Sequence, residues 1–135
     1  ESTSAGIKIP VLGYVRAGIP VEAIEDVMDY EEISPSLAKS GEFFALYIKG
    51  NSMEPKMYEG DVVIVRKQAD IDSGDVAVVL VNSMDATVKK VVKKGTGISL
   101  IPFNTDYSVM DFSAEDISRL PVSIVGKVVE LRRKF

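Results

Sequence analysis

The sequence predicts a mostly β protein, built on a compact, curved or barrel-like sheet with one or two short helical turns. Valine and isoleucine together number 31, against 7 leucines, and β-branched side chains favour strands over helices. Apolar runs recur about every ten residues, each bounded by glycine, aspartate or asparagine, as in sheet proteins with short strands. Helix signals are few. A chain of 135 residues is long enough for one domain with its own core.

The first twenty residues begin as a linker and become a strand and a loop. Residues 1–9 are small and polar at their start, and we expect them to be the remainder of a linker before a domain over residues 10–135. An extended run at 11–15 precedes a loop at 16–20, which glycine and proline mark. The acidic stretch 22–32 fits either a loop or an irregular strand.

A short helical turn and six strands follow. Ser34 is suited to be an N-cap and Pro35 to be the first helical residue, so residues 34–40 predict one helical turn. The predicted strands are 43–49, 61–67, 75–82, 86–94, 98–103 and 121–135. Gly126 lies inside the last of them and predicts a bulge or a sharp bend.

The composition excludes several classes of function. The chain has no cysteine and no histidine, which removes disulfides, thiolate chemistry, the commonest metal ligand and the usual general base. We therefore expect no metal and no cofactor, and the missing cysteine fits a cytoplasmic protein. The net charge of −4 is unfavourable for binding nucleic acid directly. The basic residues 131–135 are expected to be the solvated end of a strand, and no apolar run is long enough to span a membrane.

Ser52 lies in a turn between two apolar runs, within GNSMEPKM at residues 50–57, and has two interpretations. It is a good N-cap for a one-turn helix, with Pro55 tolerated in the first turn. It is also a candidate nucleophile, because a helix start offers unpaired main-chain N–H groups that stabilise an oxyanion. The local sequence is compatible with both.

A serine nucleophile needs a base to take its proton, and here only aspartate, glutamate and lysine are available. Serine–lysine pairs are an established solution, provided that burial keeps the lysine neutral. The segment ATVKKVVKK places Lys89 and Lys90 among valines, on opposite faces of a strand. Thr87 shares the face of Lys89. Periodicity does not choose between the two lysines.

Four segments together resemble the self-cleaving C-terminal domain of LexA-type repressors, a group that includes lambda-type CI repressors and UmuD-like proteins. They resemble, in turn, the family's scissile loop, its nucleophile motif, its lysine motif and its Pro-x-Asn-x-x-aromatic segment. These are YVRAGIP (14–20), GNSMEPKMYEGDVVIV (50–65), ATVKKV (86–91) and LIPFNTDY (100–107). The resemblance covers about residues 10–131. In the family the lysine after Thr-Val is the base, so the resemblance selects Lys89.

The resemblance implies a mostly antiparallel, strongly curved β-domain that acts as a serine peptidase on itself. Ser52 would attack the carbonyl of the bond between Ala17 and Gly18, and neutral Lys89 would take the hydroxyl proton and return it to the leaving amine. Small residues at this bond allow the backbone to fold tightly against the nucleophile.

The turn around the nucleophile would supply the oxyanion site. Main-chain N–H groups around Ser52, in the turn that Asn51 and Met53 flank, would hold the developing negative charge.

The resemblance also implies partners. A homodimer is expected, together with a RecA filament on single-stranded DNA that stimulates cleavage after DNA damage, and an anti-repressor is a further candidate. Operator DNA would be reached only through an N-terminal helix-turn-helix domain, which this chain does not contain.

Two alternatives to a repressor remain. One is a UmuD-like polymerase accessory protein, which lacks the DNA-binding domain but typically cleaves Cys-Gly, whereas the bond here is Ala17–Gly18. The other is a non-catalytic module of the same fold that dimerises or binds an anti-repressor. The Ala-Gly bond favours the repressor.

Overall fold

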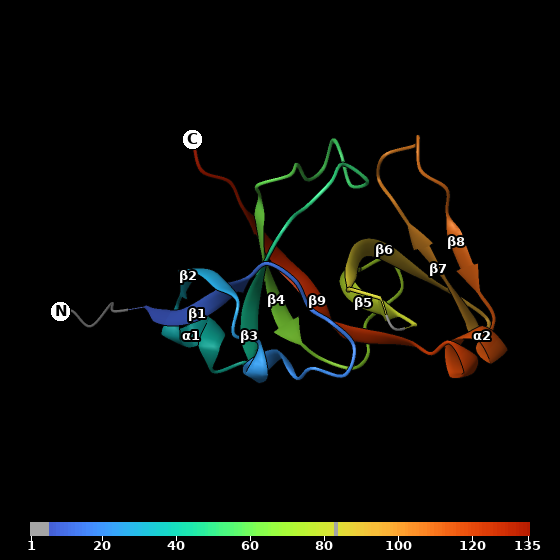
Figure 1. The fold of residues 1–135 in the computed structure, drawn as a ribbon, viewed down its shortest axis with the longest axis horizontal. Coiled ribbons are helices and arrows are strands. Elements are labelled where there is room, and N and C mark those ends of the chain that lie inside the picture. The colour runs from blue at the N-terminus through green and yellow to red at the C-terminus, as the bar shows by residue number, and fades with distance from the viewer. Residues whose placement is uncertain (1–5, 83) are drawn as a thin grey trace.

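The computed structural model describes residues 6–82 and 84–135, and its main feature is one mixed sheet of nine strands (Figure 1). The strand order is β2-β1-β3-β4-β9-β5-β6-β7-β8. The strands are β1 (Ile7–Leu12), β2 (Val27–Ile33), β3 (Phe43–Tyr47), β4 (Val62–Lys67), β5 (Val76–Val81), β6 (Thr87–Lys94), β7 (Gly97–Ile101), β8 (Met110–Phe112) and β9 (Val122–Arg132). The helices are the 3-10 helix η1 (Val21–Ala23), α1 (Pro35–Ala38) and α2 (Ala114–Arg119). The predicted fold class is confirmed.

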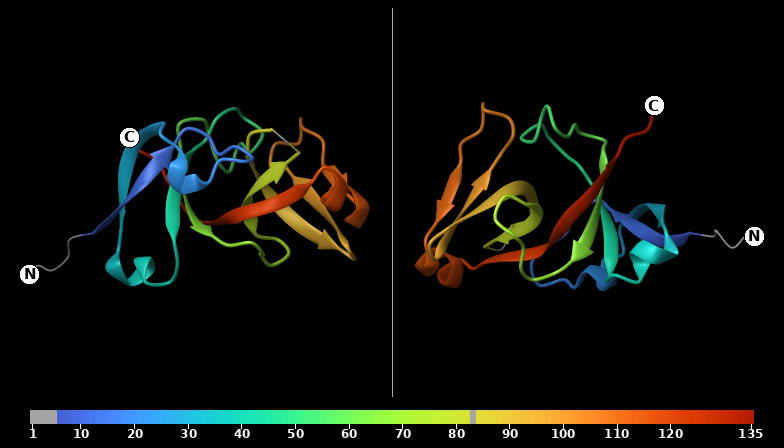
Figure 2. Two further views of the ribbon diagram at one scale, coloured as in Figure 1. Left: turned by 60° about the horizontal axis from the view of Figure 1, so that its bottom comes forward. Right: turned by 180° about the vertical axis from the view of Figure 1, so that it is seen from behind.

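The long strand β9 joins the two halves of the sheet. It pairs antiparallel with β4 and with β5, and Figure 2 shows it running from the β1–β4 half to the half that carries α2. The register with β5 shifts where Gly126 and Ile124 face successive residues of β5. A Cβ on Gly126 would lie 2.3 Å from the carbonyl oxygen of Arg66, so only glycine fits here. The predicted bulge at Gly126 is confirmed. The pairs are antiparallel except β1–β3, which is parallel.

Two N-terminal segments differ from the sequence-based expectation. β1 begins at Ile7, so it includes residues expected in the linker, because Ile7 pairs with Ile33 and Ile9 is buried in the core. Residues 1–5 lie outside the described residues. The acidic stretch left open between loop and strand contains η1 and the strand β2, most of whose side chains are exposed. Exposure on both faces explains why it shows no alternation of apolar and polar residues.

Helix α1 follows the prediction, whereas β8 and α2 were not predicted individually. Ser34 caps α1, accepting a hydrogen bond from Leu37 N at 3.0 Å. β8 has three residues, too few for a periodic pattern. α2 has a capping box formed by Ser113 and Asp116, a signal that the sequence contained. No helix in the described part of the chain is long and apolar enough to cross a membrane.

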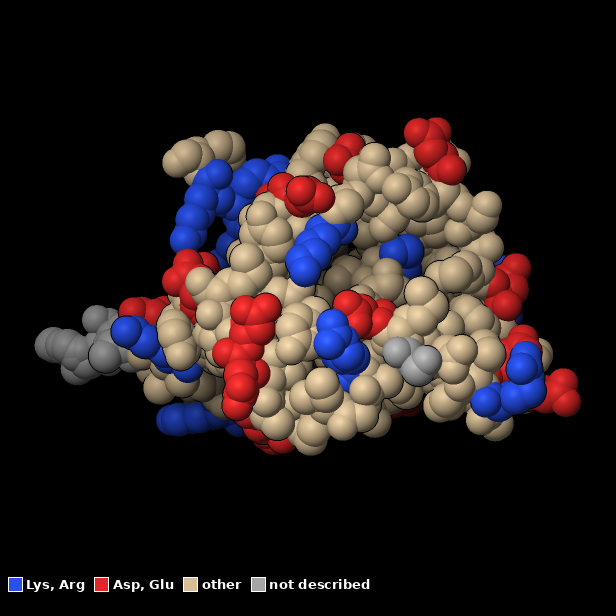
Figure 3. Space-filling view, in the orientation of Figure 1, with Lys and Arg blue, Asp and Glu red and all other residues tan. Residues whose placement is uncertain are grey.

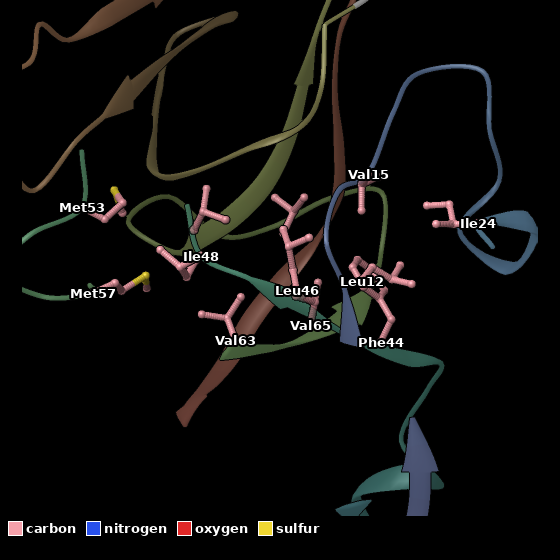
Figure 4. Close-up of a cluster of buried hydrophobic side chains, with 12 residues drawn as sticks. Leu12, Val15, Ile24, Phe44, Leu46, Ile48, Met53, Met57, Val63 and Val65 are labelled. Carbon is pink, nitrogen blue, oxygen red and sulfur yellow. The ribbon is translucent and has the colours of Figure 1, made fainter. Parts of the chain in front are cut away.

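The largest core cluster attaches the turn that carries Ser52 to the sheet (Figure 4). Met53 and Met57 are 3% and 4% exposed, and they belong to the same cluster as Leu46 of β3 and Val63 of β4. Because two side chains of this turn are anchored in the core, the turn has a fixed place relative to the sheet.

The sequence suggested that the basic C-terminus is the solvated end of a strand, but one of its arginines binds a buried carboxylate. Arg133 donates two hydrogen bonds to Asp61, at 2.8 and 2.6 Å, and the side chain of Asp61 is only 3% exposed. Asp61 also accepts a hydrogen bond from Tyr58 N at 2.8 Å. The hydrogen bonds from Arg133 lower the pKa of Asp61 below its ordinary value. The C-terminus therefore holds the end of the loop that leads into β4.

We expect Asp61→Asn to lower the free energy of unfolding at pH 7 by about 2 kcal/mol, the scale of a hydrogen bond to a charged group. A carboxyl whose pKa is depressed on folding stabilises the protein above its unfolded pKa, and that contribution is lost as the pH falls through the folded pKa. The gap between variant and wild type should therefore shrink below about pH 4. Urea unfolding of the variant and the wild type, at pH 7 and below about pH 4, measures the difference in the free energy of unfolding. The exposed Asp26→Asn is the control, and an equal effect of both substitutions would contradict the role of Asp61.

Candidate active site

Ser52 lies in the loop between β3 and β4, and this loop is closed at its base. Gly60 N donates to Ile48 O at 3.0 Å, and Ile48 N donates to Asp61 O at 2.8 Å. Residues 50–57 form bends and turns, so the interpretation of Ser52 as the N-cap of a one-turn helix is wrong. Its only bond of helical spacing runs from Met57 N to Met53 O at 3.0 Å. The Ser52 hydroxyl contacts Lys89 instead of capping a helix.

Lys89 reaches Ser52 from β6, on the opposite side of the site. Its Nζ donates to Ser52 Oγ at 3.0 Å, to Thr87 Oγ1 at 2.6 Å and to Val88 O at 3.2 Å. The bond to Thr87 reflects the shared strand face. Lys90 is half-buried on the other face, so of the two candidate lysines it is Lys89 that contacts Ser52.

Burial controls the charge of Lys89. The residue is 9% exposed, and burial lowers its pKa below the ordinary value of a lysine. Removing water disfavours the ammonium form relative to the neutral amine. An amine of lowered pKa beside a serine hydroxyl is suited to accept the hydroxyl proton.

Ser52 and Lys89 line one cavity, of about 150 Å³, between the end of β3, the loop after it and the start of β6. Tyr14 and Gly13 line it from the segment after β1. On the face seen in Figure 3, lysine and arginine side chains are interspersed with aspartate and glutamate. Within residues 6–82 and 84–135, no group of three or more acidic side chains is arranged to hold a metal ion.

The main chain around Ser52 offers free donors. Within the described chain, no acceptor is found for the main-chain N–H groups of Asn51, Ser52 and Met53. On either side of them, Gly50 N donates to Glu59 Oε1 at 2.8 Å and Glu54 N donates to Asn51 O at 3.2 Å. Three consecutive N–H groups beside a serine hydroxyl are able to bind an oxyanion.

The Ala17–Gly18 bond does not lie in this cavity. Both residues are in a tight turn, in which Ile19 N donates to Arg16 O at 3.2 Å and Gly18 has a φ of +85°. Neither residue lines the cavity of Ser52 and Lys89. In Figure 4 Met53 lies at one end of the cluster and Ile24 at the other, with Val15 between them, and the chain that follows Val15 bends away from Met53. The structure thus brings Ser52 and Lys89 together but leaves the candidate scissile bond elsewhere.

Two contacts hold the segment before this bond. Ala86 N donates to Val15 O at 2.7 Å, and Arg16 forms an isolated antiparallel bridge with Asp85. The side chains of this second pair also meet, with Arg16 Nε 2.8 Å from Asp85 Oδ1. Along an antiparallel pair, residues before Val15 lie nearer to Lys89 and residues after it lie farther away. Ala17 would reach Ser52 only if this register were broken.

Sequence reasoning missed the partners that hold the site in place. Asn104, in the loop between β7 and β8, donates through its main-chain N–H to Ser52 O at 3.0 Å. The Pro-x-Asn segment drew attention to this loop but gave it no role. The Arg16–Asp85 pair had no signal beyond the charges themselves.

A serine hydroxyl in contact with a buried lysine amine is the arrangement that serine–lysine peptidases use. The chain belongs to the Peptidase S24-like family, whose pattern it matches over residues 10–129. It is 42% identical over 136 residues to the LexA repressor of Thermotoga petrophila, covering 99% of this chain and 66% of that protein. The LexA repressor of Thermotoga maritima gives the same figures.

A third LexA repressor is similar at a lower identity. The LexA repressor of Gluconobacter oxydans is 35% identical over 130 residues, which is 96% of this chain and 52% of that protein. The resemblance to LexA-type proteins is therefore confirmed. The chain spans about half to two thirds of the length of these relatives.

Proposed function

We propose that this chain is the self-cleaving part of a LexA-like transcriptional repressor, and that Ser52 and Lys89 hydrolyse its own Ala17–Gly18 bond. The observation that carries the proposal is the 3.0 Å contact between Lys89 Nζ and Ser52 Oγ, with Lys89 buried and its pKa lowered. Nucleophile and base in direct contact, with burial favouring the neutral base, are what acyl transfer without histidine requires.

The contacts of Lys89 suit the neutral amine. A neutral amine has two N–H donors and one lone pair, and Lys89 Nζ has three partners. Thr87 Oγ1 and Val88 O accept the two N–H bonds. In this neutral form the lone pair faces Ser52, so the 3.0 Å contact, in which the ammonium form donates to Ser52 Oγ, becomes one in which the Ser52 hydroxyl donates to Nζ. This arrangement prepares transfer of the hydroxyl proton to Nζ.

The reaction has two stages: formation of an ester between Ala17 and Ser52, and hydrolysis of that ester. Ser52 Oγ attacks the Ala17 carbonyl carbon while its proton moves to Lys89 Nζ, and the N–H groups of residues 51–53 hold the oxyanion. The C–N bond then breaks, the Lys89 ammonium protonates the Gly18 amine, and an ester joins Ala17 to Ser52. Water attacks this ester with Lys89 as base, which frees Ser52 and leaves a carboxylate on Ala17.

Regulation follows from the position of the loop. The scissile bond must leave its present register to reach Ser52, so cleavage depends on the population of a docked form. A partner that binds the docked form better raises that population by its differential affinity. We infer that a RecA filament on single-stranded DNA is this partner, because the relatives are LexA repressors.

Weakening the Arg16–Asp85 pair should speed cleavage. The pair is exposed, at 48% and 55% of the side-chain surfaces, and it holds the segment that must move. We expect Asp85→Asn to raise the self-cleavage rate about two- to fivefold, the range that an exposed ion pair supports. High salt screens the Arg16–Asp85 ion pair, so it should reduce the difference in self-cleavage rate between Asp85→Asn and the wild type. Asp72→Asn removes the same charge elsewhere and is the control; slower cleavage by Asp85→Asn would contradict the assignment.

The remaining roles are inferred from the relatives. We propose that the chain dimerises, that it acts in the cytoplasm, and that operator DNA is bound by a separate helix-turn-helix domain, so that cleavage separates binding from dimerisation. An anti-repressor is a further candidate partner. The repressor is favoured over a UmuD-like polymerase factor because the relatives compared are named LexA repressors.

The test is incubation of the purified chain at pH 7 and at about pH 10, with N-terminal sequencing of the products. Self-cleavage yields a new terminus at Gly18, faster at the higher pH because more Lys89 is neutral. Ser52→Ala should remain whole under both conditions. A wild-type chain that stays intact at high pH and with added RecA filament would show instead a non-catalytic module.

A further inference from the structure

The loop between β7 and β8 is hydrogen-bonded to the turn that carries Ser52. The two lie side by side in the views of Figures 1 and 2, and three hydrogen bonds join them. Asn104 N donates to Ser52 O at 3.0 Å, Asn104 Nδ2 donates to Asn51 O at 2.9 Å, and the Tyr107 hydroxyl donates to Asn51 Oδ1.

The loop has its own internal support. Asp106 N donates to Asn104 Oδ1 at 3.0 Å, and Tyr107 N donates to Asn104 O at 3.1 Å. Phe103 packs against the core cluster that contains Met53. All four polar atoms of Asn104 are therefore hydrogen-bonded: its two nitrogens donate to the Ser52 turn, and its two oxygens accept from its own loop. Such an arrangement fixes the orientation of the amide.

Two of these bonds fix the direction of the free N–H groups. Asn51 O belongs to the same planar peptide group as Ser52 N–H, and Ser52 O to the same group as Met53 N–H. Both peptide bonds are trans, so each N–H points opposite to its carbonyl. Because both carbonyls point at Asn104, the N–H groups of Ser52 and Met53 point away from it. Accepting a hydrogen bond at the carbonyl also polarises the N–H of the same group.

We propose that Asn104, supported by Tyr107, is a positioning residue for the oxyanion site of the Ser52 turn. It acts by holding the Asn51 and Ser52 carbonyls so that the N–H groups of Ser52 and Met53 are directed at the oxyanion. The inference rests on the proposed self-cleavage. It adds a second loop to the site, 53 residues from Asn51 along the chain, which touches neither Lys89 nor the Ala17–Gly18 bond.

The decisive variant is Asn104→Asp. It keeps the main-chain bond to Ser52 and the acceptor for Asp106 N, but replaces the amide donor by a carboxylate oxygen that repels Asn51 O. We expect the self-cleavage rate at its alkaline plateau to fall roughly 100-fold, near the loss of one oxyanion donor. The added negative charge can raise the pKa of Lys89 and move the pH at half-maximal rate upward, so rates are compared at the plateau, where Lys89 is neutral. The uncharged variant Tyr107→Phe should leave that pH unchanged. Tyr107→Phe should cost about fivefold, as expected for one hydrogen bond.

Thr105→Ala is the matched control, because Thr105 is an exposed residue of the same loop. Its rate should equal that of the wild type. Thermal unfolding of each variant shows whether the fold is retained; if Asn104→Asp does not fold, the milder Tyr107→Phe decides the matter.

Each outcome has a distinct meaning. A plateau rate of Asn104→Asp within threefold of the wild type overturns the positioning role alone, as does a slow Tyr107→Phe whose pH midpoint has shifted, because that shift reports disturbed surroundings of Lys89. A folded Tyr107→Phe with the wild-type rate overturns the supporting role of its hydroxyl and, where Asn104→Asp is unfolded, the inference itself. A wild-type chain that does not cleave overturns the proposed function together with this inference.

Discussion

Lys89→Arg is expected to abolish self-cleavage, lowering the rate by roughly 10⁴-fold or more, the scale seen when one member of a nucleophile–base pair is lost. Arginine keeps the positive charge and can still donate a hydrogen bond to Ser52. It does not lose its proton in a protein, however, so it cannot accept the hydroxyl proton. The measurement is the first-order rate of conversion of the intact chain to two fragments, followed by mass spectrometry at about pH 10.

Lys90→Arg is the control for this substitution. Lys90 lies next in the sequence but on the opposite strand face, so its replacement should leave the rate within about twofold of the wild type. Lys89→Ala should be as inactive as Lys89→Arg, since neither side chain can act as a base. Measurable cleavage by Lys89→Arg would contradict the role of Lys89 and leave Ser52 with some other base.

The cleavage rate of the wild type is expected to rise about tenfold per pH unit and then to level off, because the neutral fraction of Lys89 rises tenfold per unit below its pKa. Burial lowers that pKa, so the midpoint of the rise should lie below about pH 10.4, the ordinary value for lysine. Rates measured from pH 6 to pH 11 give the profile. Asp85→Asn should shift the whole curve upward without moving its midpoint.

The same shift has a consequence for stability. A lysine whose pKa is lower in the folded state binds fewer protons there than in the unfolded state, between the two pKa values. Lys89 therefore makes the fold more stable as the pH rises through this window. For the cleavage rate, a profile that falls as the pH rises, while the chain remains folded, would contradict a neutral amine as the base.

The strands that could be predicted from the sequence are those with buried faces. β4, β5 and β6 are rich in valine, and each adjoins an aspartate, asparagine or glycine at one end or both, so their positions follow from composition and boundaries. The segment of β2 was left open between loop and strand because its side chains are mostly exposed, and β8 was not predicted because three residues show no periodic pattern. These elements owe their conformation to pairing with β1 and β7.

The site could be predicted only in part. Ser52 and Lys89 were identified by chemistry and by resemblance, and the strand period placed Thr87 beside Lys89, where it is found. Of the two interpretations of Ser52, the N-cap of a one-turn helix is not observed: Met53 and Met57 are buried in the core, and the hydroxyl of Ser52 contacts Lys89. The hydrogen bonds from Asn104 to the turn require two loops that are far apart in the sequence to lie side by side, and no local sequence pattern predicts this.

The most direct test of the central claim is the pKa of Lys89 itself, measured by NMR titration of its side-chain resonances in the uncleavable Ser52→Ala variant. If Lys89 is a base kept neutral by burial, its pKa lies below the ordinary 10.4 or so of lysine and matches the midpoint of the wild-type cleavage profile. A pKa at or above that ordinary value, or one that differs from the midpoint by more than about one unit, the usual scatter of lysine pKa values in proteins, would contradict the account.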